Sequence, residues 1–253
     1  MPTGAIRKLA EVITVSTPDF VRPVAKNNTG IAQWLTESGS PVNATPEYEM
    51  RKPSFGILGA EIDVLHTAIE DLSYDAVGDA LKRAAIDFAR VEAGAFVNGV
   101  ASPAVGPAGI MTNIQTVKAE SVNVASLAAL VGSLKSEYLA NGSFVMSTSV
   151  FHSLLGVADD NGRPIAAHGI FGASPNTVFG YPVYFDENLP EDKPVLFGDI
   201  RAGYLVADRV GTSISVNPYA NFAGVKLWVR KRSGGIVTIR EAVKAIELDD
   251  GNE

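Results

Sequence analysis

The sequence of 253 residues contains no cysteine, which excludes disulfides, zinc–thiolate sites and thiol nucleophiles. Basic residues are scarce too: 21 lysines and arginines stand against 28 aspartates and glutamates, so the formal net charge is −7. Tight wrapping of nucleic acid needs a concentrated basic surface, and this balance argues against it. No apolar run approaches membrane-spanning length, and the N-terminus has no signal-peptide core. With 46% hydrophobic residues, the composition is that of a globular protein. Together with the missing signal-peptide core and membrane span, it predicts a soluble protein made in the cytoplasm.

Motifs for catalysis and metal binding are also missing. His66, His152 and His168 are well separated, and none has metal-ligand spacing. The sequence has no GxSxG elbow, no phosphate-binding P-loop and no GxGxxG after a strand. Asp159 and Asp160 are adjacent in a DNG turn, where we expect solvated side chains. We therefore predict no catalytic residue, no metal and no cofactor.

The clearest local pattern predicts a long helix ending at Asn98-Gly99. Ser73 or Asp75 is suited to cap its N-terminus. A helix of about 24 residues would be roughly 36 Å long, well above the usual length, which indicates a beam rather than a member of a compact bundle. Its apolar positions recur at three- and four-residue spacing: Val77, Leu81, Ala84, Phe88, Val91 and Ala95.

Further elements follow in a mixed order. A second helix opened by Asn123 and ending at Asn141-Gly142 precedes a strand at 144–146 and a third helix at 148–155. The remainder is rich in strands: GYPVYF, PVLFGD, GYLVADR, SISVNPY, VKLWVRKR and GIVTIREA. Helices and strands in this order, with no βαβ repeat, predict an α+β fold.

The N-terminal part is harder to read. Residues 1–28 show little periodicity, so they form either a frayed terminus or an extended arm that becomes ordered against a neighbouring subunit. Residues 31–37 and 47–52, joined by a turn at 39–41, predict a polar two-stranded ribbon. Such a hairpin is marginal alone in water, so we expect it to lean on another molecule.

Charged residues beside glycines allow two interpretations. In FGDIRAGYLVADRVG, the pairs Asp199 with Arg201 and Asp208 with Arg209 fit either an active site or strand ends that meet another copy of the chain. For the run from Arg230 to Arg232 we favour a solvated strand end or an inter-subunit ion-pair site over phosphate binding.

Trp34 and Trp228 are isolated aromatic residues on expected strands. A stacking platform for bases would need several rings together, so we interpret them as core or interface anchors.

The order of these features resembles the major capsid proteins of tailed bacteriophages, which have the Hong Kong 97 shell fold. AQWLTES…PEYEMRKPSFGILGAEIDVLHTAIEDLSYD is similar to that family's extended loop leading into its long spine helix, here ending in FVNG. Four further blocks follow in the family's order over about 220 residues: VMSTSVFHSLLGVADDNGRPI, GYPVYFDENLP, FGD…Y…DRVG and FAGVKLWVRKRSGGIVTIREAVKAI. Each block is weak alone, but their shared order is specific.

The resemblance implies a division of the chain. It predicts an N-terminal arm (1–28), an extended β-hairpin loop (29–56), and an acidic tail (249–253). Between them it implies a peripheral domain with the long spine helix (57–115 and 214–235) and an axial domain (116–213 and 236–248).

The implied function is structural and not enzymatic. The resemblance implies a major capsid protein that self-assembles, as pentamers and hexamers, into the icosahedral head shell of a tailed phage or prophage around double-stranded DNA. Expected partners are sister copies, a scaffolding protein, a portal and decoration proteins, with the DNA contacted weakly and non-specifically; the location is the virion, after assembly in the host bacterial cytoplasm. The candidate inter-subunit contacts are Trp34, Glu37, Glu49, Arg51, Lys52, Asp199, Arg201, Arg209, Arg230 and Arg232.

Two departures from the family pattern matter. Some members join subunits by a lysine–asparagine isopeptide bond promoted by a glutamate, but VKLWVRKR contains neither Asn nor Glu, so Lys52 would lack partners and we expect no crosslink. No charged helical segment precedes the arm. A scaffolding segment is therefore either cleaved off or supplied as a separate protein, and Met1 favours the latter.

Two alternatives remain open at this point. An encapsulin, a bacterial compartment shell of the same fold, typically begins with an amphipathic cargo-binding helix, whereas MPTGAIRKLAEVITV is short and leads to prolines. A soluble α+β enzyme using Asp199, Asp208 and Arg209 would be a monomer or small oligomer with a deep pocket.

Overall fold

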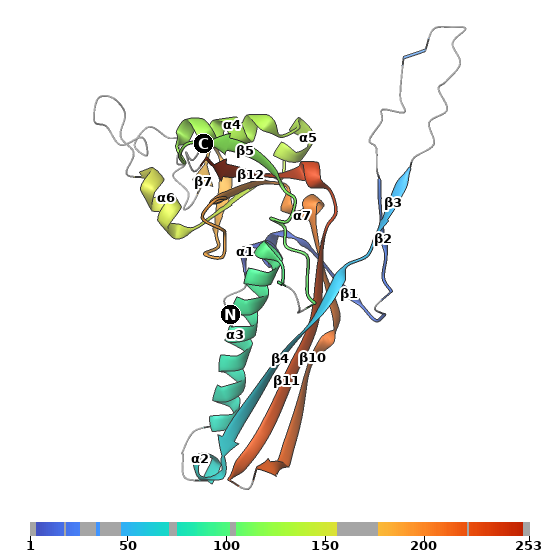
Figure 1. The fold of residues 1–253 in the computed structure, drawn as a ribbon, viewed down its shortest axis with the longest axis vertical. Coiled ribbons are helices and arrows are strands. Elements are labelled where there is room, and N and C mark those ends of the chain that lie inside the picture. Colours follow the sequence, from blue (N-terminus) through green and yellow to red (C-terminus); the bar gives the residue numbers. More distant parts are fainter. Residues whose placement is uncertain are drawn as a thin grey trace.

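The computed structural model describes residues 4–17, 19–25, 34–35, 47–70, 75–101, 105–155, 177–221 and 223–249. Figure 1 shows an elongated molecule in which a long helix runs beside a long sheet, a second sheet with its helices sits at one end, and a narrow ribbon stands off to one side. Within the described ranges, no helix combines the length and the apolar character needed to cross a membrane.

The helices and strands have the following bounds. The helices are α1 (Ala5–Leu9), α2 (His66–Glu70), α3 (Ala76–Asn98), α4 (Val124–Ser133), α5 (Ser136–Leu139), α6 (Thr148–Leu155), α7 (Ile200–Gly203) and a 3₁₀ turn (Arg240–Ala242). The strands are β1 (Glu11–Val15), β2 (Arg22–Ala25), β3 (Tyr48–Arg51), β4 (Ser54–Leu65), β5 (Gln115–Ala119), β6 (Ser143–Met146), β7 (Thr177–Val178), β8 (Tyr181–Phe185), β9 (Val195–Gly198), β10 (Tyr204–Asn221), β11 (Gly224–Val237) and β12 (Val243–Leu248).

The long sheet has the strand order β1-β10-β11-β4. β11 pairs antiparallel with β10 and with β4, while β1 pairs parallel with β10. Because side chains alternate across a sheet, β11 sends Leu227 and Val229 to the side of α3, where both are buried, and sends Trp228 and Arg230 to the opposite side, where both are exposed. One face of this sheet is thus covered by α3 and the other is open.

The predicted long helix is confirmed as α3. Asp75 caps it by accepting a hydrogen bond from Gly78 N at 2.8 Å, and Gly99 ends it with a φ of 81°, a conformation that favours glycine. The expected apolar face is wrong at Val91, whose side chain is 55% exposed. The last turns leave the sheet and enter the second core, so Phe96 and Val97 are buried instead.

The second sheet has the order β5-β12-β9-β6-β8-β7, and its core forms the main hydrophobic cluster. Phe144 and Phe197 pack with ring centroids 4.4 Å apart. The rings of Phe96 in α3 and Tyr204 in β10 also pack together, with centroids 6.1 Å apart. This contact connects the long helix and the long sheet at the core of the second sheet. The mixture of helices and largely antiparallel sheets confirms the predicted α+β class.

Several boundaries differ from the sequence prediction. The second helix is split into α4 and α5 because Leu134 is extended, with ψ of 150°. GYLVADR and SISVNPY form one continuous strand, β10. VKLWVRKR and the first residues of GIVTIREA likewise form one strand, β11. β10 belongs to the long sheet from Tyr204 onward.

The N-terminal residues also differ from expectation. Neither a frayed terminus nor an arm ordered only by a neighbour describes Ala5–Val15, which forms α1 and β1 within the chain itself. Ile6 is 1% exposed and anchors α1 in the main core, while β1 extends the long sheet. Burial of Ile6 stabilises this segment, which its weak periodicity did not indicate.

The predicted ribbon exists but with a different partner strand. β3 pairs antiparallel with β2, from Arg22↔Arg51 to Ala25↔Tyr48, so the pairing of residues 47–52 with residues 31–37 is wrong. Of the expected strand at 31–37, the structure describes Trp34 and Leu35, which are not in a strand, and the rest lies outside the described residues. The turns expected at 39–41 and 159–163 lie outside them as well.

Candidate subunit interface

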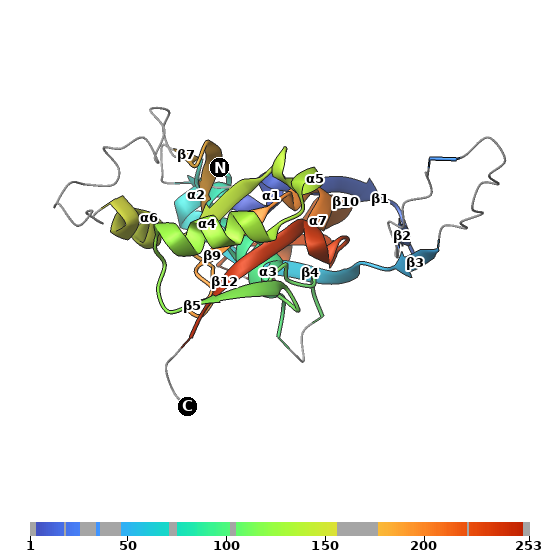
Figure 2. The same ribbon diagram turned by 90° about the horizontal axis from the view of Figure 1, so that it is seen from above.

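The ribbon β2–β3 forms a two-stranded sheet of its own and projects from the body of the molecule, as Figure 2 shows from above. It exposes apolar side chains: Met50 is 67% exposed and Tyr48 59%. Trp34, in the segment that joins the two strands, is fully exposed. A ribbon with so little apolar cover is marginal in water, and exposed apolar side chains of this kind mark interaction surfaces.

The base of the ribbon is fixed to the body by polar contacts. Arg51 Nη1 donates hydrogen bonds to the carbonyl oxygens of Val237 and Thr238, both at 2.9 Å. Lys52 Nζ bonds to Asp19 Oδ1 at 2.7 Å, and this bond lowers the pKa of the Asp19 carboxyl. The ribbon is therefore held at its root and open along its length.

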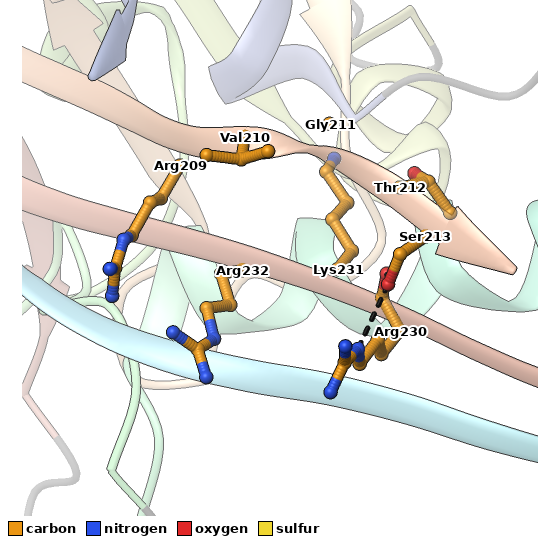
Figure 3. Close-up of a pocket in the computed structure, with 8 residues that line it drawn as sticks. All are labelled: Arg209, Val210, Gly211, Thr212, Ser213, Arg230, Lys231 and Arg232. Carbon is orange, nitrogen blue, oxygen red and sulfur yellow. Dashed lines mark hydrogen bonds between the residues drawn. The ribbon is translucent and has the colours of Figure 1, made fainter. Parts of the chain in front are cut away.

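A groove of about 340 Å³ lies where β10 and β11 run side by side. Arg209 of β10 stands directly opposite Arg232 of β11, and Ser213 stands opposite Arg230. Figure 3 shows the guanidinium groups of these arginines on one side of the two strands and Lys231 directed to the other. We call Arg209, Arg230 and Arg232 the arginine groove.

The backbone beside the groove is irregular. The register shifts between Arg209 and Ser213, so Val210 to Thr212 stand opposite a single residue, Lys231, and form a β-bulge. Val210 has a φ of 40°, which is a strained conformation for a β-branched residue, and its side chain is 69% exposed. The residues of the bulge and the three arginines line the same groove.

The cations on the other face of the sheet are fully compensated. Glu92 of α3 is 6% exposed and accepts from Lys231 Nζ at 2.7 and 2.8 Å and from Arg7 Nη1 at 3.1 Å. Arg7 also pairs with Asp208. Burial opposes the charge of Arg7, but the hydrogen bond to Asp208 and the charge of Glu92 outweigh it and raise the pKa of the guanidinium. This buried network ties α1, α3, β10 and β11 together.

The structure does not gather the four charged residues of the FGDIRAGYLVADRVG stretch into one site. Asp199 is 8% exposed and caps α7 by accepting from Ala202 N at 3.0 Å, while Asp208 pairs with Arg7. Arg201 is exposed on α7. Across the described ranges, no cluster of His, Asp or Glu could hold a metal ion.

Of the remaining candidate contacts, Glu49 lies on the ribbon. Glu49 pairs with Arg51 at 2.8 Å on β3, and Glu37 lies outside the described residues. Sequence reasoning missed Arg7 and Glu92. Glu92 continues the four-residue spacing of Ala84 and Phe88, which was the available sign that its carboxylate faces inward.

A chain with an open sheet face, a projecting ribbon with exposed apolar side chains and a cationic groove has the features of a structural subunit that assembles with other chains. A model of the phage capsid family matches residues 1–248, and the chain belongs to that family as a major capsid shell protein. No curated protein matches the sequence.

The solved structures agree. The capsid of a native GTA particle superposes with a TM-score of 0.84 at 25% identity, covering 98% of this chain and 91% of that one. Microbacterium phage Oxtober96 gives 0.76 at 15% identity over 98% and 92% of the two chains, and Mycobacterium phage Bobi gives 0.71 at 16% identity over 99% and 92%. The resemblance read from the sequence is thereby confirmed for the fold and the family.

Proposed function

We propose that this capsid protein builds the closed icosahedral head shell of a tailed phage or prophage, as pentamers and hexamers, around double-stranded DNA. The observation that carries the proposal is the ribbon β2–β3, which projects from the body with Met50 and Trp34 exposed. Such surface gains stability only against another molecule, and in a shell that molecule is a sister copy. The native GTA capsid, 25% identical, was solved with C5 symmetry, which supports a five-fold arrangement.

Two groups of residues make the proposed contacts between subunits. One group comprises residues of the ribbon and of the sequence beside its strands, namely Trp34, Glu37, Glu49, Arg51 and Lys52, and Arg51 and Lys52 also hold the base of the ribbon. The sheet and its surroundings contribute Asp199, Arg201, Arg209, Arg230 and Arg232. Of these, Asp199 has its carboxylate engaged as a helix cap, so we propose that it acts by shaping α7 beside the exposed Arg201.

The proposed contact with packaged DNA is weak and independent of sequence. Binding to DNA grows with the number of phosphates neutralised by Lys and Arg, and acidic residues outnumber basic ones here by 28 to 21. A scaffolding protein, a portal and decoration proteins complete the proposed set of partners, in a virion assembled in the host bacterial cytoplasm. We propose no catalytic role.

Electron microscopy and sedimentation of the purified protein test the proposal. We expect closed shells that sediment far ahead of a chain of 26.6 kDa. Shells from infected or induced cells should contain nuclease-protected double-stranded DNA, whereas an enclosed enzyme would indicate an encapsulin. A protein that stays monomeric at every concentration, with or without co-expressed phage proteins, would contradict the proposal.

A further inference from the structure

We propose that the arginine groove is a carboxylate-binding site that is filled by a second copy of this chain in the shell. The inference rests on the proposed self-assembly and adds the chemistry of one contact. The groove supplies Arg209, Arg230 and Arg232 on the open face of the long sheet, and the neighbouring subunit supplies aspartate or glutamate side chains.

The first argument is electrostatic. Arg209 and Arg232 are a directly opposed cross-strand pair, and like charges in that position destabilise a sheet. In the described part of the chain neither arginine has a carboxylate within ion-pair distance, and Arg230 bonds only to the neutral hydroxyl of Ser213, at 2.9 Å. Of the cations on the other face, Lys231 pairs with Glu92, and Arg7 pairs with both Glu92 and Asp208. A counter-anion on the open face would remove the repulsion.

The second argument is geometric. The groove lies at the bulge, where Val210 to Thr212 are out of register and Val210 has a positive φ. Backbone strain persists where the surrounding structure imposes it, and it gathers at binding sites. A guanidinium presents its donors as a planar fork that matches a carboxylate in two parallel hydrogen bonds. Arg209 and Arg232 are only half-buried, so their forks remain accessible.

The choice of a second copy follows from charge and position. The chain carries 28 acidic residues against 21 basic ones, so any sister copy presents an excess of carboxylates. The groove lies close to the root of the ribbon, because Val15 of β1 pairs with Arg209 and the chain runs on from there to Asp19, which binds Lys52, and into β2. The projecting ribbon and the groove are therefore neighbouring parts of one open surface. Packaged DNA is disfavoured because the groove is one local cationic spot on a chain of net charge −7.

Charge-removing variants give the first test. The double variant R209Q/R232Q should raise the subunit concentration needed for half-assembly about tenfold, which corresponds to about 1.4 kcal/mol. R209K/R232K keeps the positive charges but loses the planar guanidinium donors, so it should raise the concentration for half-assembly by a smaller factor. The matched control R83Q removes an exposed arginine of α3, 78% exposed and paired with Asp79, and should leave assembly within about twofold of the parent.

The unassembled subunit separates this role from a merely structural one. R232Q relieves the repulsion with Arg209, so its free energy of unfolding as a monomer should equal or exceed that of the parent. A monomer that is markedly destabilised by R232Q would overturn the proposal, because the arginines would then be paired within their own chain.

Mapping identifies the occupant directly. Because the chain has no cysteine, T212C places a single thiol on the groove wall for a photoreactive maleimide. In shells made from mixed light and heavy isotope-labelled subunits, we expect crosslinked peptides that join one light and one heavy chain at an acidic segment. Crosslinks confined to one chain, crosslinks to packaged DNA, or normal assembly of R209Q/R232Q would each overturn the inference. In all three cases shells still form, so the proposed function would stand.

Discussion

At the scale of single residues, the buried carboxylate of Glu92 is the most consequential charge in the subunit. Glu92 is 6% exposed and forms ion pairs with both Arg7 and Lys231. E92Q leaves the partly buried Lys231 without a counter-charge and removes one of the two carboxylates that pair with Arg7, and breaking a buried pair in this way is strongly destabilising. We expect the free energy of unfolding to fall by about 3 kcal/mol in urea titrations.

A matched control is available on the same helix. Asp87 pairs with Arg90 at 3.5 Å, with both side chains more than two-thirds exposed. D87N should change the free energy of unfolding by less than about 0.5 kcal/mol, because solvated pairs contribute little. Equal effects of E92Q and D87N would show that the Glu92 network does not hold α1 and α3 to the sheet.

Tyr204 makes a second prediction, on alkaline stability. Its hydroxyl donates to Ala108 O at 2.6 Å, and burial raises its pKa well above the ordinary value. Above about pH 10 the unfolded chain loses the phenolic proton while the folded chain retains it, so stability falls as pH rises. Y204F lacks the hydrogen bond, which should lower the free energy of unfolding by about 1 kcal/mol at neutral pH. Because phenylalanine has no phenolic proton, the variant does not lose this stability at alkaline pH.

The gap in unfolding free energy between the parent and Y204F should therefore narrow above about pH 10 and close near pH 11. Chemical denaturation at several pH values measures it. Tyr219, which is 95% exposed, provides the control, and Y219F should differ from the parent by a constant amount. A gap for Y204F that is constant with pH would contradict the argument.

At the scale of elements, the bulge in β10 combines a strained residue with a continuous strand. Val210 has a positive φ, which costs a β-branched residue about 1–3 kcal/mol, while glycine adopts it freely at an entropic cost of about 0.5–1 kcal/mol. We expect V210G to stabilise the isolated subunit by about 1 kcal/mol, measured by thermal or urea unfolding.

Val216 on the same strand is the control, since it is 60% exposed but is not among the residues with positive φ. V216G should destabilise the subunit by about 1 kcal/mol. If both substitutions destabilise equally, Val210 carries no strain and the bulge is held by other contacts.

The elements also show which features a sequence can reveal. The ends of α3 follow from Asp75 and Gly99, because capping is decided by neighbouring residues. The partner of β3 could not be found in this way, because β2 lies more than twenty residues away and pairing at that distance is decided by tertiary contacts. Likewise, the opposition of Arg209 and Arg232 is visible only once the register of β10 and β11 is known.

At the scale of the whole molecule, the order of weak motifs along the chain was sufficient to predict the α+β class and the capsid family. The sequence did not show how Ala5–Val15 folds, because β1 is stabilised by pairing with β10, almost two hundred residues away. The arm is thus divided between the body and the projecting ribbon. We propose that the part within the body stabilises the folded subunit and that the ribbon serves assembly.

The last prediction uses that division. Trp34 is fully exposed in the single chain, so W34A should leave the free energy of unfolding of the monomer unchanged. In the shell, burial of an aromatic side chain against a neighbour contributes strongly to association. W34A should therefore raise the concentration for half-assembly about tenfold or more.

Fluorescence follows the same residue directly. In a W228F background Trp34 is the one remaining tryptophan, since the chain has two. Its emission should be that of a solvated indole in monomers and should shift to shorter wavelength as shells form, with a concentration dependence that matches sedimentation. W228F itself serves as the assembly control. If the emission of Trp34 in closed shells remains that of an indole in water, Trp34 is not buried against a neighbouring subunit. The contacts that close the shell would then lie on the open face of the long sheet.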